Sequence, residues 1–588
     1  MTALRLPLFT WPPPGAAREL PCPQCGARGA KQVLVSVAWQ TEDKPDRRND
    51  VVACPTCGAA FYDCLTPPDY TSANIAAAGR AEFYLQQGTG LWNGAQPLAR
   101  LERPAGARYL EVGCGFGFAL DFAIHGLGWQ GEGYDPSPIA EIGRARLGLP
   151  IVPAYFAGAA EGQNDVILAA EVIEHVPSPT RLLALLRDAL APEGVLVLTT
   201  PDAAAIRPDT SSGALVPLLS PGLHLILQSE RSLIALLHAS GFDHAVVERE
   251  GCSLTAFAAR IPLRLSADRA AQRARFRAWL ARRASAFHAD RSLFFAFAGH
   301  AFSESVNDSD LATAQSVLPG LAARLRTEFA IDLDMPGALV EELATASLAH
   351  LVDLMPLNLP AILIARAFLR LAGGETRSAI RPLFVAGGKA AAALRRALAE
   401  RMLEDGESED LGWVAAAEIL LSDAEAGVPE VPVRLAALPA APGGSGGTER
   451  RREIVRRSFT GLVNAAQIPV ARALAAAEGL GEEGRVLLAP GPLSVSERDM
   501  LFSLGVLALQ DGAGDAASAG KLFARVRAAL APEETASGLY WASLRGEMLA
   551  VERESGSEAA RALLASELAA LGSAAAGAPE DLRERVRV

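Results

Sequence analysis

The segment 108–117 reads Arg-Tyr-Leu-Glu-Val-Gly-Cys-Gly-Phe-Gly and constrains the fold more than any other part of the chain. Its first five residues favour a buried β-strand, and Gly113, Gly115 and Gly117 predict a sharp turn into a helix. Glycines in such a turn leave room for a ligand to lie against the main chain. The spacing G-x-G-x-G, with Glu111 before the first glycine, differs from the G-x-G-x-x-G of dinucleotide-binding domains. We therefore expect a strand–turn–helix unit that binds a ligand.

The residues after this turn alternate between strand and helix patterns. A second short strand, 131–135, ends in Asp135, about eighteen residues after the last glycine. An acid at the tip of the second strand of a doubly wound sheet can accept hydrogen bonds from both ribose hydroxyls of a nucleoside. Further elements follow in order: an apolar strand from 165 into a charged turn at 171–176, a helix at 180–191, a strand at 195–201 and a helical stretch ending near 242. The pattern predicts an α/β fold.

These motifs, in this order, resemble the class I S-adenosylmethionine (SAM) methyltransferases of the type 11 and type 23 groups, over roughly residues 80–260. The resemblance implies a doubly wound, Rossmann-like sheet that binds SAM, with its methionine end along Gly113, Gly115 and Gly117, its ribose on Asp135 and its ammonium near Glu111. Many relatives carry an Asp for the adenine amino group after the next strand, where this chain has Ala154-Tyr155-Phe156. We expect an apolar adenine slot there, with Tyr155 or Phe156 against the ring.

Two C-x-x-C pairs lie near the N-terminus, Cys22 with Cys25 and Cys54 with Cys57, each followed by glycine. Two such knuckles can complete a tetrahedral zinc shell, and the alternating residues 31–38 between them predict a strand, as in a zinc ribbon. Four cysteine ligands leave no position for water, so we expect structural zinc. A redox or disulfide pair is the alternative.

The cluster Glu171-x-x-Glu174-His175 begins where a predicted parallel strand ends, and ligands bind at such ends. In one interpretation His175 is the general base that takes a proton from a substrate hydroxyl, assisted by Glu174. In another, Glu171, Glu174 and His175 hold a divalent cation that acidifies the hydroxyl. The cluster resembles the E-x-x-E-H metal site of small-RNA 2'-O-methyltransferases and ubiquinone-pathway O-methyltransferases, the former adding a downstream histidine that His224 matches. The third interpretation is a structural helix cap.

Length and charge limit the remaining possibilities. The chain has 588 residues, a net charge of -12 and 50% hydrophobic residues, which allows three or four domains. Its acidity removes the global attraction on which nonspecific nucleic-acid binding rests. No window offers about twenty uninterrupted apolar residues, so we expect no membrane span and a cytoplasmic protein.

From about residue 262 onward the strand–helix alternation stops and helical patterns dominate. The arginine-rich stretch 265–283 carries Phe276, Trp279 and Leu280 on one face, which favours an amphipathic helix over a docking face for an acidic partner. Residues 500–532 fit one degenerate tetratricopeptide-like repeat. We predict the following domains: a zinc-ribbon-like domain 1–70, a methyltransferase domain 71–262, an α-helical domain 263–437, a flexible linker 438–450 and a second α-helical domain 451–588.

The sequence therefore predicts a SAM-dependent methyltransferase that methylates a hydroxyl, or a carbon, of a small molecule, sugar or glycan precursor. Alternatives are a scaffold protein with a degenerate SAM-binding core and an RNA methyltransferase. The scaffold hypothesis draws on the missing adenine-side Asp, whereas the RNA hypothesis draws on the zinc ribbon and the arginine-rich stretch. The all-α region is expected to bind a protein partner or to self-associate.

Overall fold

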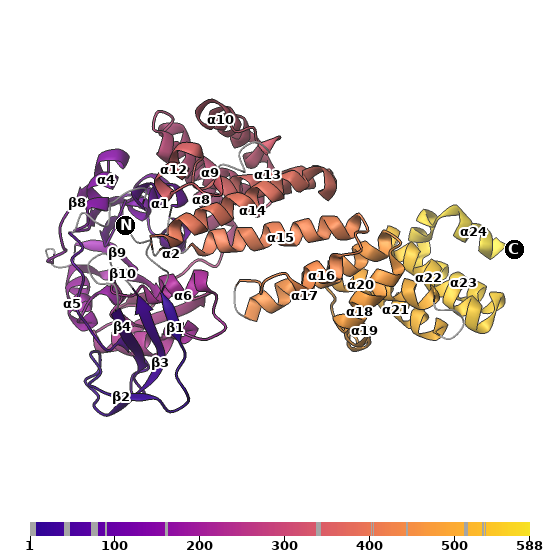
Figure 1. Ribbon diagram of the computed structural model, residues 1–588, viewed down its shortest axis with the longest axis horizontal. Helices are drawn as coiled ribbons and strands as arrows, with labels where there is room; N and C mark the ends of the chain where they lie inside the picture. Colours follow the sequence, from indigo (N-terminus) through magenta and orange to yellow (C-terminus); the bar gives the residue numbers. More distant parts are fainter. Residues whose placement is uncertain are drawn as a thin grey trace. The chain divides into compact units, whose positions relative to one another are not determined.

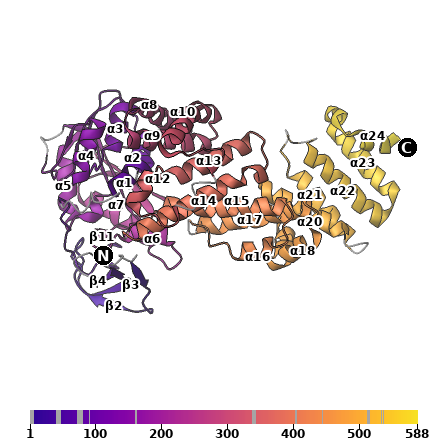
Figure 2. The same cartoon turned by 45° about the horizontal axis from the view of Figure 1, so that its top comes forward.

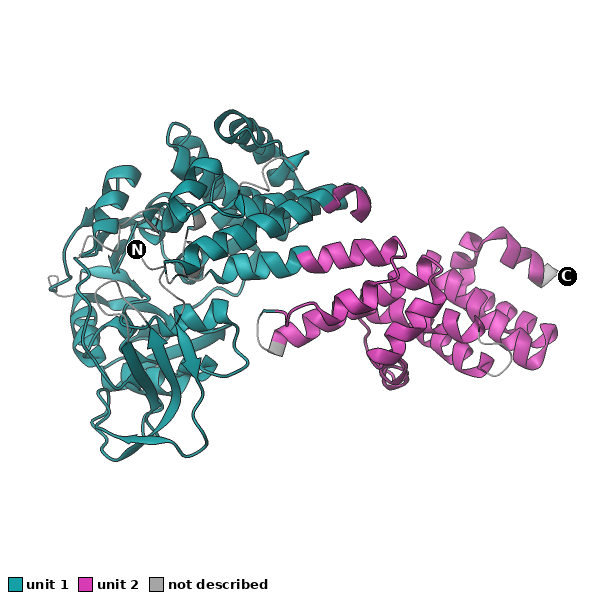
Figure 3. Ribbon diagram, viewed as in Figure 1, with its two compact units in different colours: residues 1–375, 382–415, 442–444 teal, residues 376–381, 416–441, 445–588 magenta. Residues whose placement is uncertain are grey.

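The computed structural model describes the chain except for short gaps; the described residues are 7–39, 47–71, 80–88, 91–158, 163–336, 343–401, 403, 405–442, 445–510, 515–531, 534 and 537–587. The chain divides into two compact units (Figure 3). Unit 1 comprises residues 1–375, 382–415 and 442–444, and unit 2 comprises residues 376–381, 416–441 and 445–588.

The centre of unit 1 is a mixed sheet with the strand order β12-β13-β10-β9-β6-β7-β8 within the described residues. Figure 1 labels three of its strands, β8, β9 and β10. The strands β6 to β10 run parallel to one another. β13 lies between β10 and β12 and is antiparallel to both. The bounds are β6 (Arg108–Val112), β7 (Gln130–Tyr134), β8 (Ile151–Val152), β9 (Asn164–Ala170), β10 (Leu190–Pro201), β12 (His244–Glu250) and β13 (Ser253–Ala259). The predicted doubly wound α/β fold is confirmed.

The central strands are apolar because both faces of the sheet are covered. Val166, Ile167 and Leu168 of β9 are fully buried, and Ile167 belongs to a core with Leu183 and Leu233. Those two leucines come from α5 and α7 respectively. The elements between the strands are α3 (Phe118–Asp121), the π-helical turn η2 (Phe122–Gly126), α4 (Pro138–Leu147), the 3-10 turns η3 (Ile173–His175) and η4 (Ala203–Ala205), α5 (Pro179–Ala189), α6 (Ser212–Leu219) and α7 (Glu230–Ala239).

The cysteine-rich N-terminal segment forms a second sheet, in which the strand expected at 31–38 lies within β3. The last strand of this sheet, β11, comes from the middle of the chain and pairs antiparallel with β5. Val35, Val37 and Tyr62 share one core with Leu215 and Leu219 of α6. Figure 2 shows α6 beside this sheet. The bounds are β1 (Leu8–Thr10), β2 (Ala17–Glu19), β3 (Ala30–Trp39), β4 (Arg47–Ala53), β5 (Ala60–Tyr62) and β11 (Ile226–Leu227). The cysteine-rich segment is therefore built into the fold of unit 1.

Helices complete unit 1. The predicted amphipathic arginine-rich helix is confirmed as α8 (Arg269–Ala286), whose Trp279 is buried and donates a hydrogen bond from Nε1 to Asp121 Oδ1 at 2.7 Å. Arg283 pairs with the same carboxylate at 2.6 Å. The other helices wholly inside unit 1 are α1 (Arg80–Gln87), α2 (Leu91–Ala99), α9 (Arg291–Asn307), α10 (Leu311–Phe329), α12 (Leu348–Leu354) and α13 (Leu359–Ala372).

Within its described residues, unit 2 contains helices joined by turns and loops, and no strands. Two helices, α14 (Arg377–Ala399) and α15 (Gly406–Glu425), have residues in both units. The remaining helices are α16 (Val431–Ala436), α17 (Ser445–Asn464), α18 (Ile468–Ala477), α19 (Leu480–Leu487), α20 (Val495–Gln510), α21 (Ala516–Ala528), α22 (Gly538–Ser555), α23 (Ser557–Leu571), η7 (Gly572–Gly577) and α24 (Glu580–Arg587). Residues 445–450, which composition assigns to a linker, are part of α17, so its glycines do not interrupt the helix.

None of the described helices is both long and apolar enough to cross a membrane alone, although α12 and α13, which meet at 44°, pass that length and composition test as a pair.

Candidate functional site

The glycine-rich turn connects β6 to α3 with three consecutive left-handed glycines. The φ angles of Gly113, Gly115 and Gly117 are 77°, 51° and 86°, a region that residues with a Cβ rarely adopt. A Cβ on Gly113 would lie 2.4 Å from Val172 Cγ2, so this glycine is required for packing. A Cβ on Gly115 would meet nothing within 4 Å. The main chain at Gly115 therefore faces open space that a ligand can fill.

Asp135 follows β7 and lies beside this turn, as the sequence predicts. Its Oδ2 accepts a hydrogen bond from the Gly115 amide at 2.9 Å, and its Oδ1 accepts one from the Ser137 amide at 2.8 Å. These bonds fix the carboxylate at the carboxyl end of β7. Ser137 Oγ also donates to Oδ1, so Oδ2 of the half-buried Asp135 is the oxygen that can still accept a hydrogen bond from a ribose hydroxyl.

Glu111 is buried behind the same turn, at the end of β6. Its Oε2 accepts a hydrogen bond from the hydroxyl of Tyr109 at 3.0 Å. Burial, with a smaller contribution from the charge of Asp135, raises the pKa of Glu111 to about 8, although the hydrogen bond from Tyr109 lowers it. A buried carboxyl with a raised pKa favours a cationic group nearby, because a cation stabilises its ionised form.

The two aromatic residues expected around the adenine differ in how far they are buried. Tyr155 is 60% exposed, whereas Phe156 packs at the edge of the core against Tyr134, with ring centroids 5.3 Å apart.

Glu171 lies at the end of β9 with a φ of 54°, which is strained for a residue with a side chain. Its Oε1 accepts a hydrogen bond from Thr199 Oγ1 at 2.9 Å.

A cluster of three side chains forms next to Glu171. Glu174 is fully buried in η3, and its Oε2 accepts a hydrogen bond from Thr200 Oγ1 at 2.9 Å. Its other oxygen, Oε1, has no hydrogen-bond partner among the described residues. The Nε2 atoms of His175 and His224 lie 3.8 and 4.0 Å from this oxygen. The structure thus unites the predicted pair with His224, from a segment 49 positions further along the chain.

The hydrogen bonds of the two imidazoles define which nitrogen faces Glu174. His224 Nδ1 lies 2.8 Å from the carbonyl oxygen of Leu218, and His175 Nδ1 lies 3.2 Å from that of Leu223. A carbonyl only accepts, so we assign the proton of each neutral ring to Nδ1 and a lone pair to Nε2. Burial lowers the pKa of His175 to about 4, which makes it a weak proton acceptor. Two lone pairs and a carboxylate oxygen then converge on one point, the arrangement of a metal site.

Sequence reasoning missed Tyr70. Its hydroxyl lies 2.5 Å from His175 Nδ1, and its ring stands edge-on to the imidazole at 5.5 Å. Burial raises the pKa of Tyr70, with further contributions from Glu174, Tyr155 and Asp135. No local sequence pattern indicates a role for this tyrosine, because only the three-dimensional course of the residues after β5 brings it to the cluster.

The four cysteines of the predicted zinc ribbon come together at the end of the second sheet. Cys22 Sγ lies 3.7 Å from Cys57 Sγ, and Cys25 Sγ lies 3.7 Å from Cys54 Sγ. All four sulfurs lie within 4.8 Å of one another, as expected for ligands of a single zinc ion. Cys64 is exposed and is not a member of this cluster.

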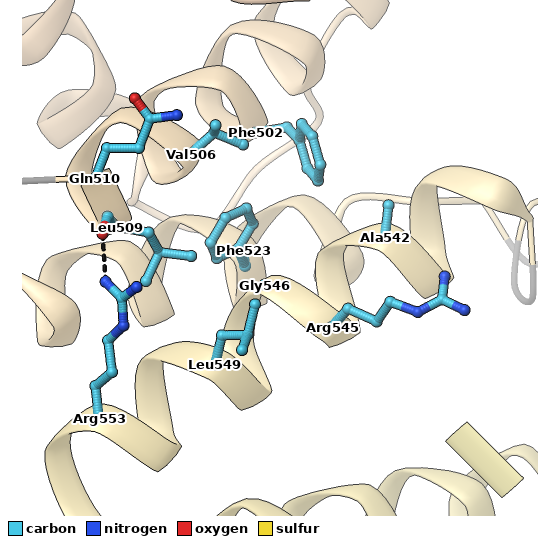
Figure 4. A pocket seen from close by; sticks show the side chains of 10 residues that line it. All are labelled: Phe502, Val506, Leu509, Gln510, Phe523, Ala542, Arg545, Gly546, Leu549 and Arg553. Atoms are coloured by element: carbon cyan, nitrogen blue, oxygen red, sulfur yellow. Dashed lines mark hydrogen bonds between the residues drawn. The ribbon is translucent and has the colours of Figure 1, made fainter. Parts of the chain in front are cut away.

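A hollow also lies in unit 2, between α20, α21 and α22 (Figure 4). It has a volume of about 810 Å³ and a largely apolar lining that includes Phe502, Phe523 and Leu549. The guanidinium groups at its rim are engaged within the chain, since Arg545 pairs with Asp581 and Arg553 donates to the Leu509 carbonyl. Nothing in its lining points to catalysis.

The sheet order, the glycine turn with Asp135 and the acid–histidine cluster define a class I SAM-dependent methyltransferase domain, accompanied here by a four-cysteine cluster. Comparison with known proteins agrees: residues 92–247 match the family model described as "Methyltransferase domain". The matched segment begins in α2 and ends in β12, so it covers β6 to β10, the glycine turn and the acid–histidine cluster, whereas β13 lies beyond it.

Curated relatives match the same region. The chain is 38% identical over 111 residues to the ubiquinone biosynthesis O-methyltransferase of Xanthomonas axonopodis pv. citri, a match that covers 17% of this chain and 46% of that protein. It is 37% identical over 108 residues to the enzyme of the same name from Ruegeria pomeroyi, covering 17% and 43%. The chain thus spans less than half the length of these relatives.

Solved structures of low identity were also found. An S-adenosylmethionine-dependent methyltransferase from Mesorhizobium loti is 19% identical with a TM-score of 0.24, covering 29% of this chain and 98% of that one. A SAM-dependent methyltransferase from Aquifex aeolicus is 17% identical with a TM-score of 0.25, covering 31% and 98%.

Proposed function

We propose that this protein is a SAM-dependent O-methyltransferase that holds its acceptor hydroxyl at a divalent cation bound by Glu174, His175 and His224. One observation carries the proposal: the buried Oε1 of Glu174 has no hydrogen-bond partner among the described residues, and the Nε2 atoms of His175 and His224 both lie within 4.0 Å of it. Ligands of one divalent cation lie about 2.0–2.2 Å from it and therefore about 3–4.4 Å from each other. The separations of 3.8 and 4.0 Å fit that range. Glu171, which the sequence motif offered as a further ligand, is not among the three residues whose ligand atoms come together, and its Oε1 accepts from Thr199 instead.

The proposed cation site and the proposed donor site share one edge of the sheet. Gly115 follows β6, Asp135 follows β7, and Glu174 follows β9, which pairs with β6. Carboxyl ends of parallel strands meet at one edge, where ligands of such sheets bind. Tyr70 supports the same arrangement, since the charges of both Glu174 and Asp135 raise its pKa.

Methyl transfer from a sulfonium is an in-line displacement, so positioning supplies much of the rate. The methyl group would pass from the donor's sulfur to the acceptor oxygen and leave S-adenosylhomocysteine. A cation held by Glu174, His175 and His224 would lower the pKa of the acceptor hydroxyl, whose proton would pass to solvent. In this chain Asp135 orients the donor's ribose, the amides of the glycine turn approach its methionine end, and Glu111 neutralises its ammonium. His175 and His224, held through their Nδ1 atoms, keep the acceptor oxygen at the carboxyl end of β9.

We infer that the acceptor is a small molecule, sugar or glycan precursor. The relatives named O-methyltransferases support oxygen as the acceptor atom, with carbon as the alternative. An RNA acceptor is disfavoured by the net charge of -12 and by the arginine-rich helix, because Arg273 and Arg277 of α8 pair with Glu304, Asp308 and Asp310. A cytoplasmic location fits such a substrate.

Calorimetric titration of the full-length protein tests the proposal. We expect wild-type protein to bind S-adenosylhomocysteine and Mn²⁺. Charge-assisted hydrogen bonds contribute about 1.5–3 kcal/mol, so Asp135→Ala should weaken S-adenosylhomocysteine binding about 10- to 150-fold. Glu174→Gln should abolish Mn²⁺ binding while leaving S-adenosylhomocysteine affinity within about twofold, because its side chain lies outside the proposed nucleoside site. Absence of heat with S-adenosylhomocysteine would overturn the proposal.

A further inference from the structure

The cysteine-rich sheet reaches the acid–histidine cluster through Tyr62, the last residue of β5. Tyr62 is buried, its amide donates to the Leu225 carbonyl at 3.1 Å, and its hydroxyl donates to the Leu219 carbonyl at 2.9 Å. These two carbonyls flank His224 in the sequence. One side chain and its own main chain therefore hold both ends of the segment that carries this histidine.

That segment in turn supports two of the three proposed cation ligands. His224 Nδ1 lies 2.8 Å from the Leu218 carbonyl oxygen, which directs its Nε2 toward Glu174. The Leu225 amide donates to the main-chain carbonyl of Glu174 at 2.7 Å. A displacement of this segment would thus move His224 and the turn that carries Glu174 together.

A second tyrosine supports the remaining ligand. Tyr70 lies in a turn in which the amide and hydroxyl of Thr71 both donate to Asp69 Oδ1, at 3.0 and 2.6 Å. Its hydroxyl lies 2.5 Å from His175 Nδ1 and 3.4 Å from the Leu223 carbonyl oxygen. With the proton on Nδ1, the N–H of His175 is shared between the Tyr70 oxygen and the Leu223 carbonyl, and the Tyr70 hydroxyl proton points to the same carbonyl. The imidazole is then held in the plane that directs Nε2 toward Glu174.

The cysteine knuckles anchor the sheet that carries Tyr62 in β5, and Tyr70 lies in the turn eight residues after that strand ends. The loop between Cys54 and Cys57 accepts hydrogen bonds from Arg231 of α7, at 3.1 Å to the Pro55 carbonyl and 3.3 Å to the Thr56 carbonyl. Immediately beyond the loop, β5 pairs with β11. The cysteine-rich sheet is therefore attached to the methyltransferase core at two places, the loop between Cys54 and Cys57 and the strand β5.

We propose that Tyr62 and Tyr70 are positioning residues of the cation site, so that the cysteine-rich N-terminal segment, which carries both tyrosines, orients the ligands of that site. This inference rests on the proposed function, since it requires the cation. Groups that hydrogen-bond the distal nitrogen of a metal-binding histidine fix its orientation, and their removal typically costs about 10- to 100-fold in metal affinity. Tyr70 acts directly on His175, whereas Tyr62 acts on His224 through the main chain.

The test is a Mn²⁺ titration of the full-length, donor-free protein, with free Mn²⁺ followed by electron paramagnetic resonance. Tyr70→Phe and Tyr62→Phe each remove one hydroxyl. Tyr540→Phe is the matched control, because the Tyr540 hydroxyl donates to Glu567 at 2.9 Å within unit 2. We expect Tyr70→Phe to raise the Mn²⁺ dissociation constant about 10-fold or more. Tyr62→Phe should raise it by a smaller factor, and Tyr540→Phe should leave it unchanged. Melting temperature and zinc content, measured alongside, should match wild type in Tyr70→Phe.

The outcomes separate this inference from the proposed function. If wild type binds Mn²⁺, Glu174→Gln does not, and both tyrosine variants bind like wild type, the positioning roles are wrong while the cation site stands. If wild type itself binds no Mn²⁺, the cation site is wrong. Should Tyr62→Phe fail to fold, Tyr70→Phe decides the question, because this half-buried residue lies in a turn outside both sheets.

Discussion

Single residues in the glycine turn decide whether a ligand can approach the main chain. Gly115 combines a left-handed φ with open space where a Cβ would stand, whereas the space beside Gly113 is filled by Val172. A Cβ on Gly117 would likewise lie 2.8 Å from Ile151 Cδ1, so Gly113 and Gly117 are required for packing and only the surroundings of Gly115 are free for a ligand.

A pair of substitutions separates these effects. Gly115→Ala and Gly106→Ala both place a Cβ at positive φ with nothing within 4 Å, so each should lose about 1–2 kcal/mol of stability. Only Gly115→Ala should also weaken S-adenosylhomocysteine binding, by at least about 10-fold, because its methyl group enters the ligand space. Calorimetric Kd values and denaturation midpoints check both effects. Equal Kd values for the two variants would remove Gly115 from the site.

Glu111 gives the site a pH dependence. With its pKa raised to about 8 by burial, its carboxyl is mostly protonated at pH 7 in the free protein. A donor ammonium favours the ionised form, so binding should release a proton and the affinity should rise between pH 6.5 and about 8. Titrations in buffers of different ionisation enthalpy measure that release. Glu111→Gln should abolish it, and unchanged proton release in this variant would contradict the assignment.

At the scale of elements, the sequence predicted the strands of the central sheet well. Apolar runs such as 166–169 are buried on both faces, and the tips carrying Glu111 and Asp135 lie beside the glycine turn. The contacts of the cysteine-rich segment could not be predicted. Its pairing with β11 joins residues more than 160 positions apart and rests on only two residues, Ile226 and Leu227. Tyr70 escaped notice for the same reason, because its role depends on the path of the chain.

Part of the site stays a prediction. Periodicity cannot determine whether His175 acts as a base or as a ligand, since that depends on which nitrogen faces Glu174. The carbonyl beside each Nδ1 supplies this information only in three dimensions. The apolar adenine slot has only partial structural support, because Tyr155 is mostly exposed.

The four-cysteine cluster makes its own prediction about elements. We expect about one zinc ion per chain, held by Cys22, Cys25, Cys54 and Cys57. Cys54→Ser should lose most of the zinc and lower the melting temperature, because metal binding and folding of such segments are coupled. Cys252→Ser, outside the cluster, should keep both at wild-type values. Elemental analysis with thermal denaturation checks this, and full zinc content in Cys54→Ser would contradict the assignment.

At the scale of the whole molecule, the two compact units carry different chemistry. The glycine turn, the acid–histidine cluster and the four cysteines all belong to unit 1. Unit 2 is built of Ala-rich helices, and Gly505 and Gly546 allow the ring of Phe523 to lie between α20 and α22. A partner or self-association role for this region stays a prediction.

This division predicts separable effects of mutation. Phe523→Ala should destabilise the protein by about 3–5 kcal/mol, since it removes a buried ring that packs against Gly505 and Gly546 in unit 2. Its S-adenosylhomocysteine and Mn²⁺ affinities should stay within about twofold of wild type, because none of the proposed ligands is in unit 2. Denaturation and calorimetry measure both quantities. A large loss of ligand affinity in a folded variant would show that unit 2 contributes to the site.

The most direct test of the account is a crystal structure of the full chain with S-adenosylhomocysteine and Mn²⁺, with anomalous data collected at the manganese edge. We expect the ribose to bind Asp135, the amino-acid tail to lie along Gly115 and one manganese peak to lie among Glu174, His175 and His224. A nucleoside bound elsewhere, together with no manganese peak at that cluster, would contradict it.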